Sequence, residues 1–531
     1  MEETCYSKLI NAYKGKSNSG YIIFNKHKMR TTQLIKDIES FSLALTHLGF
    51  KAGDTLTLYL PTCPQSIVAF YACSKLGVIA NIVHPLLPLE QLTKNLITTN
   101  SKGIMYYDIL VKNQKKLEEA HQIMINCSVA DYTFFRKIFY LIYARTKSKP
   151  SKMAINYKKL LRMYYLTRKK SKEQGVGESV VTSMHSGGTS GQPKIVKLSN
   201  NALNRLCDNL YEMYVKVNPV GKNEYGLVAL PIFHAYGLGV SIHTCLCNHY
   251  NLILIPKFNA KQINNCIKRY NVTFMAGVPI MFKKMMEEKN FEGKHLAKLK
   301  DLWCGGDTVS ENFVEHFDEK LKKYGARARL MRGYGLTEVC SVCAVNTHKD
   351  YKKLSCGKPM PNTTIEIWGA DNEEVLEANQ VGEIVVSTKC IMSGYEDGSG
   401  ITIKDNKMWI RTGDLGYLDE DGFLFVIERK KRTVKIAAVN IFPSEIEEIA
   451  RRHNLVKEAC AVAYHYNDKT YIKVFVTLNS TDVKPSKISN EIKDLIKANL
   501  IKYAVPREVI VLDSMPMTPL GKIDYKRLEI M

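Results

Sequence analysis

Apolar runs alternate with amphipathic segments through the first half of the chain. Residues 54–60, 77–83 and 272–276 are rich in apolar and β-branched residues, which is typical of strands buried on both faces of a parallel sheet. Residues 65–76 and 260–270 repeat their apolar positions at helical spacing, which predicts helices. Two further strands are predicted at 226–230 and 252–255. Strands that alternate with helices predict an α/β fold with a mostly parallel sheet.

The pattern changes in the last quarter of the chain, where short strands lie between Asp-Gly turns. The strands predicted there are 382–387, 408–411, 423–426, 460–464 and 472–477, and the helices are 444–453 and 486–500. This order predicts a small α+β unit. We place the boundary at the charged stretch 428–432, which gives an N-terminal domain of residues 1–428 and a C-terminal domain of residues 429–531.

The composition is that of a globular protein. The chain has 531 residues, of which 45% are hydrophobic and 24% charged, so disorder, collagen and coiled coil are excluded as descriptions of the whole. No run approaches the ~18 apolar residues of a membrane helix, and no basic segment leads into an apolar stretch at the N-terminus. Fourteen cysteines are scattered singly, which indicates a reducing compartment. We expect a cytoplasmic protein.

Two groups of cysteines invite a test as metal sites. Cys340 and Cys343 are spaced C-x-x-C, but no second pair or histidine cluster accompanies them at a suitable spacing. Cys245 and Cys247 lie near His243 and His249 in the sequence, which is also a weak signal. We therefore predict ordinary buried or free thiols.

The net charge of +23 is unevenly distributed. Residues 136–172 contain thirteen Lys or Arg and no Asp or Glu, interleaved with Phe and Tyr. A solvated basic insertion accounts for this composition. The alternative is an amphipathic element that contacts an anionic membrane surface and makes the protein peripherally membrane-associated. Nucleic acid is not a predicted partner, because no recognised motif accompanies the charge.

Residues 186–194, SGGTSGQPK, follow an apolar run and form the strongest chemical motif of the chain. Glycines allow a backbone to wrap closely around an anion, and hydroxyls add hydrogen-bond donors. The segment differs from a P-loop, which needs G-K-[ST] at the start of a helix, because Pro193 separates Gly191 from Lys194.

This segment resembles the phosphate loop of the adenylate-forming superfamily, which includes acyl-CoA synthetases, amino-acid adenylation domains and luciferases. Further resemblances follow in the order expected for that family: Cys304-Gly305-Gly306-Asp307, Tyr334-Gly335-Leu336-Thr337-Glu338, Arg411-Thr412-Gly413-Asp414, residues 429–447 and residues 516–523. The resemblance implies a large N-terminal domain of mostly parallel sheets flanked by helices, with a distorted barrel subdomain. It also implies a small mobile α+β lid at the C-terminus.

The resemblance also implies a role for each matching residue. The ATP/AMP-binding residues expected from it are Ser186, Gly187, Gly188, Thr189, Ser190, Gly191, Lys194, Gly305, Gly306, Asp307, Tyr334, Gly335, Asp414 and Arg429. Among them, Asp414 is expected to accept from the ribose hydroxyls, which requires an ionised carboxylate.

Four residues carry the chemistry that the resemblance implies. Thr337 is expected to donate to the α-phosphate, and Glu338 to bind Mg²⁺, which prefers carboxylate oxygens. Lys522 is expected to bridge the substrate carboxylate and the α-phosphate, where charge gathers in the transition state. Lys435 matches the lysine of the second half-reaction, and Lys431 the hinge.

The sequence indicates the acid substrate less specifically than it indicates the nucleotide site. Residues 231–237, PIFHAYG, contain no carboxylate to hold a substrate ammonium, so amino acids are disfavoured. The segment resembles that of fatty-acyl and 4-coumarate-type ligases, in which His234, Gly277 and Val278 belong to the acyl pocket. For His234 a satisfied core histidine is the alternative. The basic insertion favours a medium- or long-chain fatty acid over an aromatic acid.

The acceptor is expected to be coenzyme A, although four positions depart from the family pattern. Ala438 stands where the lid loop usually has Gly, and Glu428, Asp307 and Ser190 also replace commoner residues. Ala438, together with a basic surface suited to an acidic carrier protein, makes an acyl carrier protein the alternative acceptor. A degenerate nucleotide binder and a basic scaffold are disfavoured, because the loop lysine, the magnesium carboxylate and the final lysine are all present. The predicted protein is an ATP-dependent, Mg²⁺-requiring acid–CoA ligase.

Overall fold

The computed structural model divides the chain into two compact units. The first comprises Met1–Ile365 and Val386–Ile410, and the second comprises Glu366–Val385 and Arg411–Met531. This division cuts through strands of one sheet instead of falling in a linker. It therefore does not test the predicted boundary near residue 428, which stays a prediction. The residues that the structure describes are 3–15, 20–111, 117, 123–132, 151–165, 167, 169–186, 194–369, 373–436, 439–466, 469–479, 485–517 and 523–531.

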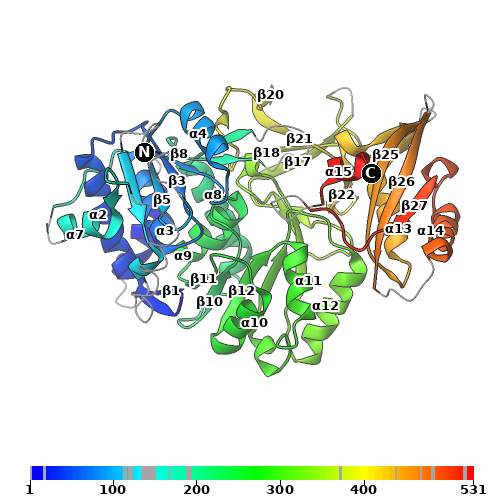
Figure 1. Cartoon of the computed structure of the whole chain (residues 1–531), viewed down its shortest axis with the longest axis horizontal. Helices are drawn as coiled ribbons and strands as arrows, with labels where there is room; N and C mark the ends of the chain where they lie inside the picture. The colour runs from blue at the N-terminus through cyan, green and yellow to red at the C-terminus, as the bar shows by residue number, and fades with distance from the viewer. Residues whose placement is uncertain are drawn as a thin grey trace. The chain divides into compact units, whose positions relative to one another are not determined.

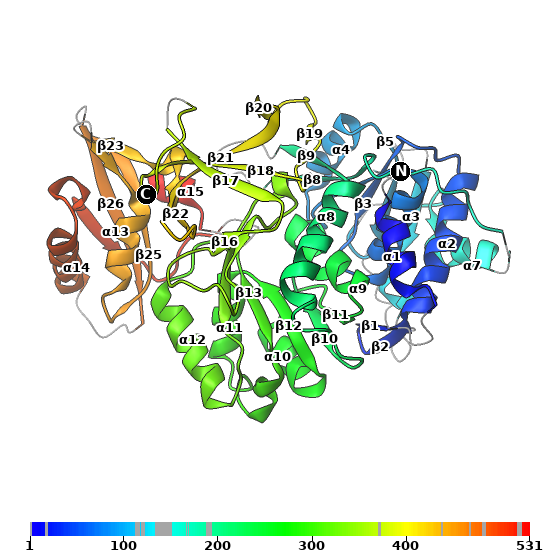
Figure 2. The same cartoon turned by 180° about the vertical axis from the view of Figure 1, so that it is seen from behind.

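The first unit contains a largely parallel sheet, which appears in green near the centre of Figures 1 and 2. Its described strands, in spatial order, are β16 (Lys358–Pro359), β15 (Ala344–Val345), β14 (Leu330–Tyr334), β13 (Asp301–Cys304), β12 (Val272–Gly277), β10 (Tyr225–Val228), β11 (Asn251–Leu254), β1 (Tyr21–Phe24) and β2 (His27–Arg30). The pairs from β14 to β1 are all parallel, as predicted.

A second sheet of the same unit is parallel in its centre. Its described strands, in spatial order, are β19 (Gly394–Tyr395), β9 (Ile195–Ser199), β8 (Val180–His185), β4 (Ile79–Ile82), β3 (Thr55–Tyr59), β5 (Ser101–Tyr107), β6 (Ile123–Cys127) and β7 (Ile155–Asn156). Every residue of β3 is buried, which accounts for its apolar run. The strand predicted from residue 77 begins at Ile79, because Gly77, at φ 68°, ends the preceding helix in a left-handed conformation.

Helices pack against both sheets. The helical elements α3 (Pro64–Leu76), α1 (Cys5–Tyr13), α8 (Asn200–Leu210), η3 (Tyr236–Thr244) and α9 (Cys245–Cys247) contact one another, with α3 against the second sheet and η3 against β10 and β12. We call them the central helices. The helical connections run in two opposite directions across the first sheet. The π-helix η3 leads from β10 to β11, whereas the chain then returns from β11 to β14 through three crossover helices, α10 (Ala260–Arg269), α11 (Pro279–Glu287) and α12 (Glu311–Lys323). Right-handed crossovers therefore place η3 and these three helices on opposite faces.

A third sheet is divided between the two units, and the predicted α+β module follows it in the second unit. The sheet contains β17 (Thr363–Trp368), β18 (Gly382–Thr388), β21 (Lys407–Leu418), β20 (Thr402–Lys404) and β22 (Leu424–Arg429). The strand predicted at 408–411 is longer than expected, because β21 runs on through Gly413 and Asp414 instead of turning there.

The described part of the module has a two-stranded sheet, β23–β24, and a three-stranded sheet, β25–β26–β27, with helices on both faces of the latter. Its described elements are β23 (Val434–Ile436), β24 (Val439–Ile441), α13 (Pro443–Arg451), β25 (Val456–Tyr466), β26 (Lys469–Leu478), α14 (Pro485–Asn499), β27 (Glu508–Val511) and α15 (Tyr525–Glu529). Val474 and Val476 face a core with α13 and α14, and Phe475 faces the core that holds Leu528 of α15. This alternation is the period-2 pattern of a strand covered on both sides.

The basic segment is described only from residue 151. Helix α7 (Tyr157–Tyr165) buries Tyr157, Leu160 and Leu161 and packs against α2 (Thr31–His47). Lys159 and Arg162 are exposed. Residues 136–150 lie outside the described part. Among the described helices, none is both long and apolar enough to cross a membrane.

Candidate active site

Parallel strands bring the candidate residues of the first unit to one sheet edge. Strands β10, β12, β13 and β14 run in the same direction. Gly277 and Tyr334 end β12 and β14, and His234 and Gly305 follow β10 and β13. Strands β10 and β12 are neighbours whose following helices cover opposite faces. In α/β sheets such a switch point, at the carboxyl ends of the strands, is where ligands bind.

Two glycines line this edge because larger residues would not fit. The Gly305 N–H donates to the Gly277 carbonyl at 3.2 Å. A Cβ atom on Gly305 would lie 3.3 Å from the Gly333 carbonyl oxygen, and one on Gly277 would lie 2.9 Å from the Phe282 ring. Gly306 has a φ of 81° and lies against Val278. These glycines therefore allow close packing of the protein against itself at this edge.

Asp307 follows these glycines and is exposed. Its Oδ1 accepts a hydrogen bond from the Thr308 N–H at 2.8 Å. The side chain therefore stabilises the turn after β13, and its predicted contact with adenine stays a prediction.

The turn after β14 has a fixed backbone. A Cβ atom on Gly335 would lie 1.6 Å from the Ser341 carbonyl oxygen, so only glycine is accommodated. A 3₁₀ turn, η5 (Thr337–Val339), follows, and Cys340 ends it at φ 57°. Glu338 of this turn is 9% exposed. The Y-G-x-T-E motif thus holds a nearly buried carboxylate at the carboxyl edge.

Tyr395 joins two of the predicted residues and was not predicted itself. Its hydroxyl donates to Glu338 Oε1 at 2.9 Å, and Lys194 Nζ lies 4.2 Å from its ring centroid. Burial and, next, the Glu338 carboxylate raise the pKa of Tyr395, so the phenol keeps its proton and donates it. Strand β19 positions Tyr395 by pairing with β9. No motif surrounds this residue, so sequence reasoning had no signal for it.

The ends of the glycine-rich segment are joined by hydrogen bonds. The Ser186 N–H donates to the Lys194 carbonyl at 2.8 Å, and the Lys194 N–H donates to Ser186 Oγ at 3.2 Å. The antiparallel pair β8–β9 leads into and out of the segment. The predicted phosphate ligands between these ends, Gly187, Gly188, Thr189, Ser190 and Gly191, lie outside the described residues.

His234 lies two residues before η3. Its ring stands 4.8 Å from the Phe233 ring, centroid to centroid, and its carbonyl accepts from the Leu238 N–H at 3.0 Å. Two residues further on, the Tyr236 hydroxyl donates to the Trp303 carbonyl at 3.2 Å. The histidine is therefore half-buried beside the switch point, where its predicted contact with the acyl group stays a prediction.

An apolar cavity of about 20 Å³ lies between η3 and the first sheet. Phe274 and Trp303 line it from β12 and β13, and Val240 lines it from η3. Trp303 and Gly305 are two residues apart along one extended segment, so both face the same side of the sheet. The cavity thus lies behind the glycine-lined edge, on the side of η3.

The second unit holds the predicted ribose ligand. Asp414 is 5% exposed, and its Oδ1 lies 2.9 Å from Arg429 Nε in an ion pair. The two residues face each other across β21 and β22. The predicted nucleotide residues Asp414 and Arg429 are therefore direct neighbours.

A buried carboxylate, Glu383, organises the R-T-G-D segment and was also not predicted. It accepts from Arg411 Nη2 at 2.5 Å and Nε at 3.1 Å, and from the Gly413 N–H at 3.3 Å. Lys430 Nζ stands 3.5 Å away. Both Arg411 donors reach Oε2 and the Gly413 N–H reaches Oε1, so the carboxylate holds the side chain and the backbone of this segment together.

The predicted hinge follows a carboxylate that is also buried. Glu428 accepts from the backbone N–H groups of Arg429 and Ser444, both at 2.9 Å, and pairs with Arg432 at 3.1 Å. Burial raises the pKa of Glu428 despite this pairing. Lys431 lies exposed in the short turn η6 (Lys430–Arg432), so its predicted role as the hinge stays a prediction.

The remaining predicted residues are only partly described. Lys435 belongs to β23, where its backbone is opposite Asn440 of β24, but its side chain lies outside the described part. Ala438 and Lys522 lie outside it entirely. An antiparallel bridge between Met517 and Ile523 flanks the segment that contains Lys522.

Comparison with protein families defines the class of this chain. The AMP-binding enzyme family matches residues 13–396, and the AMP-binding enzyme C-terminal domain matches residues 445–522. The chain therefore belongs to the AMP-binding enzyme family. This confirms the predicted adenylate-forming superfamily and the predicted acyl-CoA synthetase class, the AMP-forming acid–thiol ligases.

Relatives and solved structures are similar over almost the whole chain. A long-chain-fatty-acid–CoA ligase of Bacillus subtilis is 26% identical over 530 residues, which cover 96% of this chain and 90% of that protein. The probable 4-coumarate–CoA ligase 3 of Dictyostelium discoideum is 26% identical over 509 residues, covering 93% and 88%. The o-succinylbenzoate CoA synthetase of Bacillus subtilis, solved with its acyl-adenylate, superimposes with a TM-score of 0.80 at 22% identity, covering 100% of this chain and 98% of that one. The predicted fold class is therefore confirmed.

Proposed function

We propose that this enzyme activates a medium- or long-chain fatty acid with ATP and transfers the acyl group to coenzyme A. The observation that carries the proposal is the grouping of Lys194, Tyr395 and Glu338 at the carboxyl edge of the first unit. It combines a cation for phosphate oxygens with a carboxylate, an arrangement suited to Mg²⁺ and a polyphosphate.

The first half-reaction joins the substrate carboxylate to the α-phosphate and releases pyrophosphate. Bound Mg²⁺ would neutralise phosphate charge, and the nearly buried Glu338 carboxylate fits it because hard cations take oxygen ligands. Lys194 would bind the β- and γ-phosphates. Asp414 would accept from the ribose hydroxyls, with Arg429 beside it. These groups position the reactants and neutralise the negative charge of the phosphates, and none of them forms a covalent intermediate.

The second half-reaction transfers the acyl group from AMP to a thiol. We propose coenzyme A as the acceptor, with Lys435 acting in this step and Lys431 as the hinge for the change between half-reactions. The CoA ligases among the relatives support this acceptor. An acyl carrier protein is the alternative that the assay must distinguish.

The apolar cavity behind Gly305 supports an apolar acyl group. Its lining is mostly aliphatic and aromatic, with Thr244 and Asp301 as polar members, which resembles pockets that bind apolar ligands through few polar groups. A volume of about 20 Å³ accommodates no more than about one water-sized group. We therefore expect a fatty acyl chain to enter only when aromatic side chains such as Trp303 or Tyr236 rotate.

Pyrophosphate release tests the reaction and the acid together. The enzyme would be assayed with ATP, Mg²⁺ and acids from acetate to palmitate, with benzoate, coumarate and several amino acids, each with and without coenzyme A. We expect the strongest release with medium or long fatty acids and stimulation by coenzyme A. Strongest release with benzoate or coumarate would refute the fatty-acid proposal, and release indifferent to coenzyme A would favour a carrier protein.

Lys522→Ala tests the assignment of the adenylation lysine. Loss of one transition-state donor costs roughly 3–4 kcal/mol, or about 10²–10³ in rate, whereas ATP binding should remain nearly intact. Lys526→Ala, a lysine of α15 in the same unit, serves as the control. Pyrophosphate release by Lys522→Ala at the wild-type rate would contradict the assignment.

We also propose that the exposed face of α7 contacts anionic membrane lipid. The buried Tyr157, Leu160 and Leu161 keep the helix on the protein, so charge reversal is a cleaner test than deletion. Lys159→Glu with Arg162→Glu should reduce flotation with anionic liposomes. Lys322→Glu with Lys323→Glu on α12, both exposed, makes the same charge change elsewhere. Equal flotation of the two double variants would refute the contact.

A further inference from the structure

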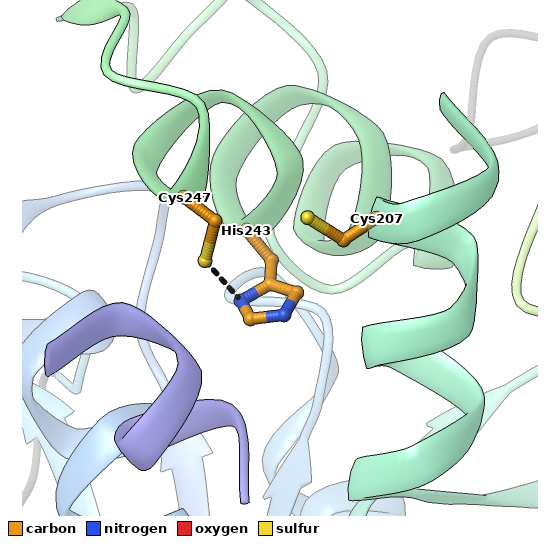
Figure 3. A group of neighbouring side chains, drawn as sticks. All are labelled: Cys207, His243 and Cys247. Carbon is orange, nitrogen blue, oxygen red and sulfur yellow. Dashed lines mark hydrogen bonds between the residues drawn. The ribbon is translucent and has the colours of Figure 1, made fainter. Parts of the chain in front are cut away.

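Three side chains with metal-ligand chemistry meet among the central helices (Figure 3). Cys207 extends from α8, His243 from η3 and Cys247 from α9, and they point toward one another. The two Sγ atoms and a nitrogen of the imidazole ring all lie within 4.8 Å of one another. We propose that this Cys-His-Cys cluster binds a zinc ion or a similar divalent cation of intermediate softness.

The separations are close to those of a bound ion. In a tetrahedral zinc site the Zn–S and Zn–N bonds are about 2.3 Å and 2.0 Å, which places the ligand atoms roughly 3.5–3.8 Å apart. Cys247 Sγ lies 3.7 Å from His243 Nδ1. The approach that Cys207 must still make is at most about 1 Å. A side-chain rotation is enough for that distance.

Hydrogen bonds already orient the imidazole as a ligand. Asn204 donates from Nδ2 to the Glu3 carbonyl at 2.7 Å, so its Oδ1 is the atom that lies 3.0 Å from His243 Nε2. An amide oxygen only accepts, and Nε2 must therefore carry the ring proton. The lone pair is left on Nδ1, which faces Cys247. Metal-binding histidines usually donate their second nitrogen in this way.

When no cation is bound, two donors compete for the lone pair on His243 Nδ1. The Tyr71 hydroxyl lies 3.0 Å from His243 Nδ1, and the Cys247 thiol lies on the same nitrogen. One lone pair cannot accept well from both donors. A cation resolves this conflict, because it replaces the two thiol protons and leaves the Tyr71 oxygen available as a fourth ligand.

Charge and ligand type select the cation. Two thiolates and one divalent cation sum to zero, so no net charge is buried in the apolar surroundings. His243 is fully buried, which separates the cluster from solvent. Sulfur and imidazole ligands favour zinc over magnesium. The cluster is therefore distinct in kind from the Glu338 carboxylate.

A bound cation would also fix one end of η3. His243 and Cys247 are four residues apart, on η3 and the α9 helix that continues it. Tyr236 lies at the other end of η3 and donates to the Trp303 carbonyl beside the apolar cavity. The cluster thus stabilises the helix that borders the cavity, independently of which acid the enzyme uses.

Cobalt titration tests the cluster with a visible probe. The full chain would be stripped of metal by a chelator under reducing conditions and titrated with Co²⁺. We expect one Co²⁺ per chain, with thiolate-to-cobalt charge-transfer absorption that Zn²⁺ abolishes by displacement. No such absorption from the wild-type chain would overturn the proposal, whatever the behaviour of the variants.

Variants assign the ligands. Cys207→Ser, His243→Gln and Cys247→Ser should each lose the absorption, and Asn204→Ala should weaken Co²⁺ binding roughly 10–100-fold. Cys73→Ser is the control, because Cys73 is a fully buried cysteine of the neighbouring helix α3. Zn²⁺ should raise the unfolding temperature of the wild type and of Cys73→Ser, and leave that of the three ligand variants unchanged. Absorption that persists in Cys207→Ser and Cys247→Ser would overturn the assignment.

Discussion

Replacing Tyr395 by Phe isolates one hydrogen bond to Glu338, the proposed magnesium ligand. The change removes the hydroxyl that donates to Glu338 Oε1 at 2.9 Å and keeps the ring under Lys194. A hydrogen bond to a charged group contributes about 1.5–3 kcal/mol, and every 1.4 kcal/mol or so is a factor of ten. We expect a roughly 10–100-fold rise in the Mg²⁺ concentration for half-maximal activity, the range found when outer partners of metal ligands are removed.

The assay is pyrophosphate release at saturating acid and ATP, measured across Mg²⁺ concentrations. The maximal rate at high Mg²⁺ should be largely retained, because Phe leaves Glu338 in place to bind. Tyr59→Phe is the matched control, since Tyr59 donates to the Leu87 carbonyl at 3.0 Å in the same unit. Superimposable Mg²⁺ curves for Tyr395→Phe and the control would refute the reasoning. A lower maximal rate with no shift along the Mg²⁺ axis would refute it as well.

Three further predictions concern other groups. Asp414→Asn should weaken ATP binding roughly 10–100-fold, because it removes charged hydrogen bonds to the ribose, and unchanged calorimetric affinity for ATP would contradict this role. His348→Gln should destabilise the protein at about pH 6 but hardly at pH 8.5. Asp301 lies 3.3 Å from His348 and raises its pKa in the folded protein. The pair therefore stabilises the fold fully below the ordinary histidine pKa of about 6.5, and this stabilisation is lost as the pH rises through the pKa of the folded state. Unfolding midpoints that differ equally at both pH values would exclude this pair. Glu447→Gln should cost about 3–5 kcal/mol of stability, since Glu447 is buried and pairs with Arg432 at 2.6 Å; a loss below 1 kcal/mol in denaturant unfolding would show that the pair contributes little.

The fold was predictable wherever burial alone determines the pattern. Strand β3 is buried throughout, and strand β12 likewise, so both were predicted with their ends correct to within one residue. The ends of elements depend on single backbone conformations instead. Gly77 ends a helix at φ 68°, and an apolar run that continues past it gives no sign of this.

The candidate site was predictable only as far as local motifs extend. Tyr395 and Glu383 act through side-chain contacts to residues far away in the sequence, and nothing in their own neighbourhood distinguishes them. The sequence interpretation of the cysteines was limited in the same way. Cys245 and His249 share a sequence neighbourhood with His243, yet Cys245 bonds to the Val240 carbonyl and the His249 ring lies against Tyr13. Cys207 reaches the cluster from another helix, which spacing alone could not reveal.

The carboxyl-edge arrangement of the first unit bears on how such an enzyme can diverge. The carboxyl ends of β10, β12, β13 and β14 and the turns that follow present the candidate residues, while the rest of each strand forms the framework. Turns at one edge can change in sequence without repacking the strands beneath them. A descendant could therefore acquire a new acid preference by a few substitutions near His234 and Gly277 while it inherits the nucleotide chemistry near Glu338 unaltered.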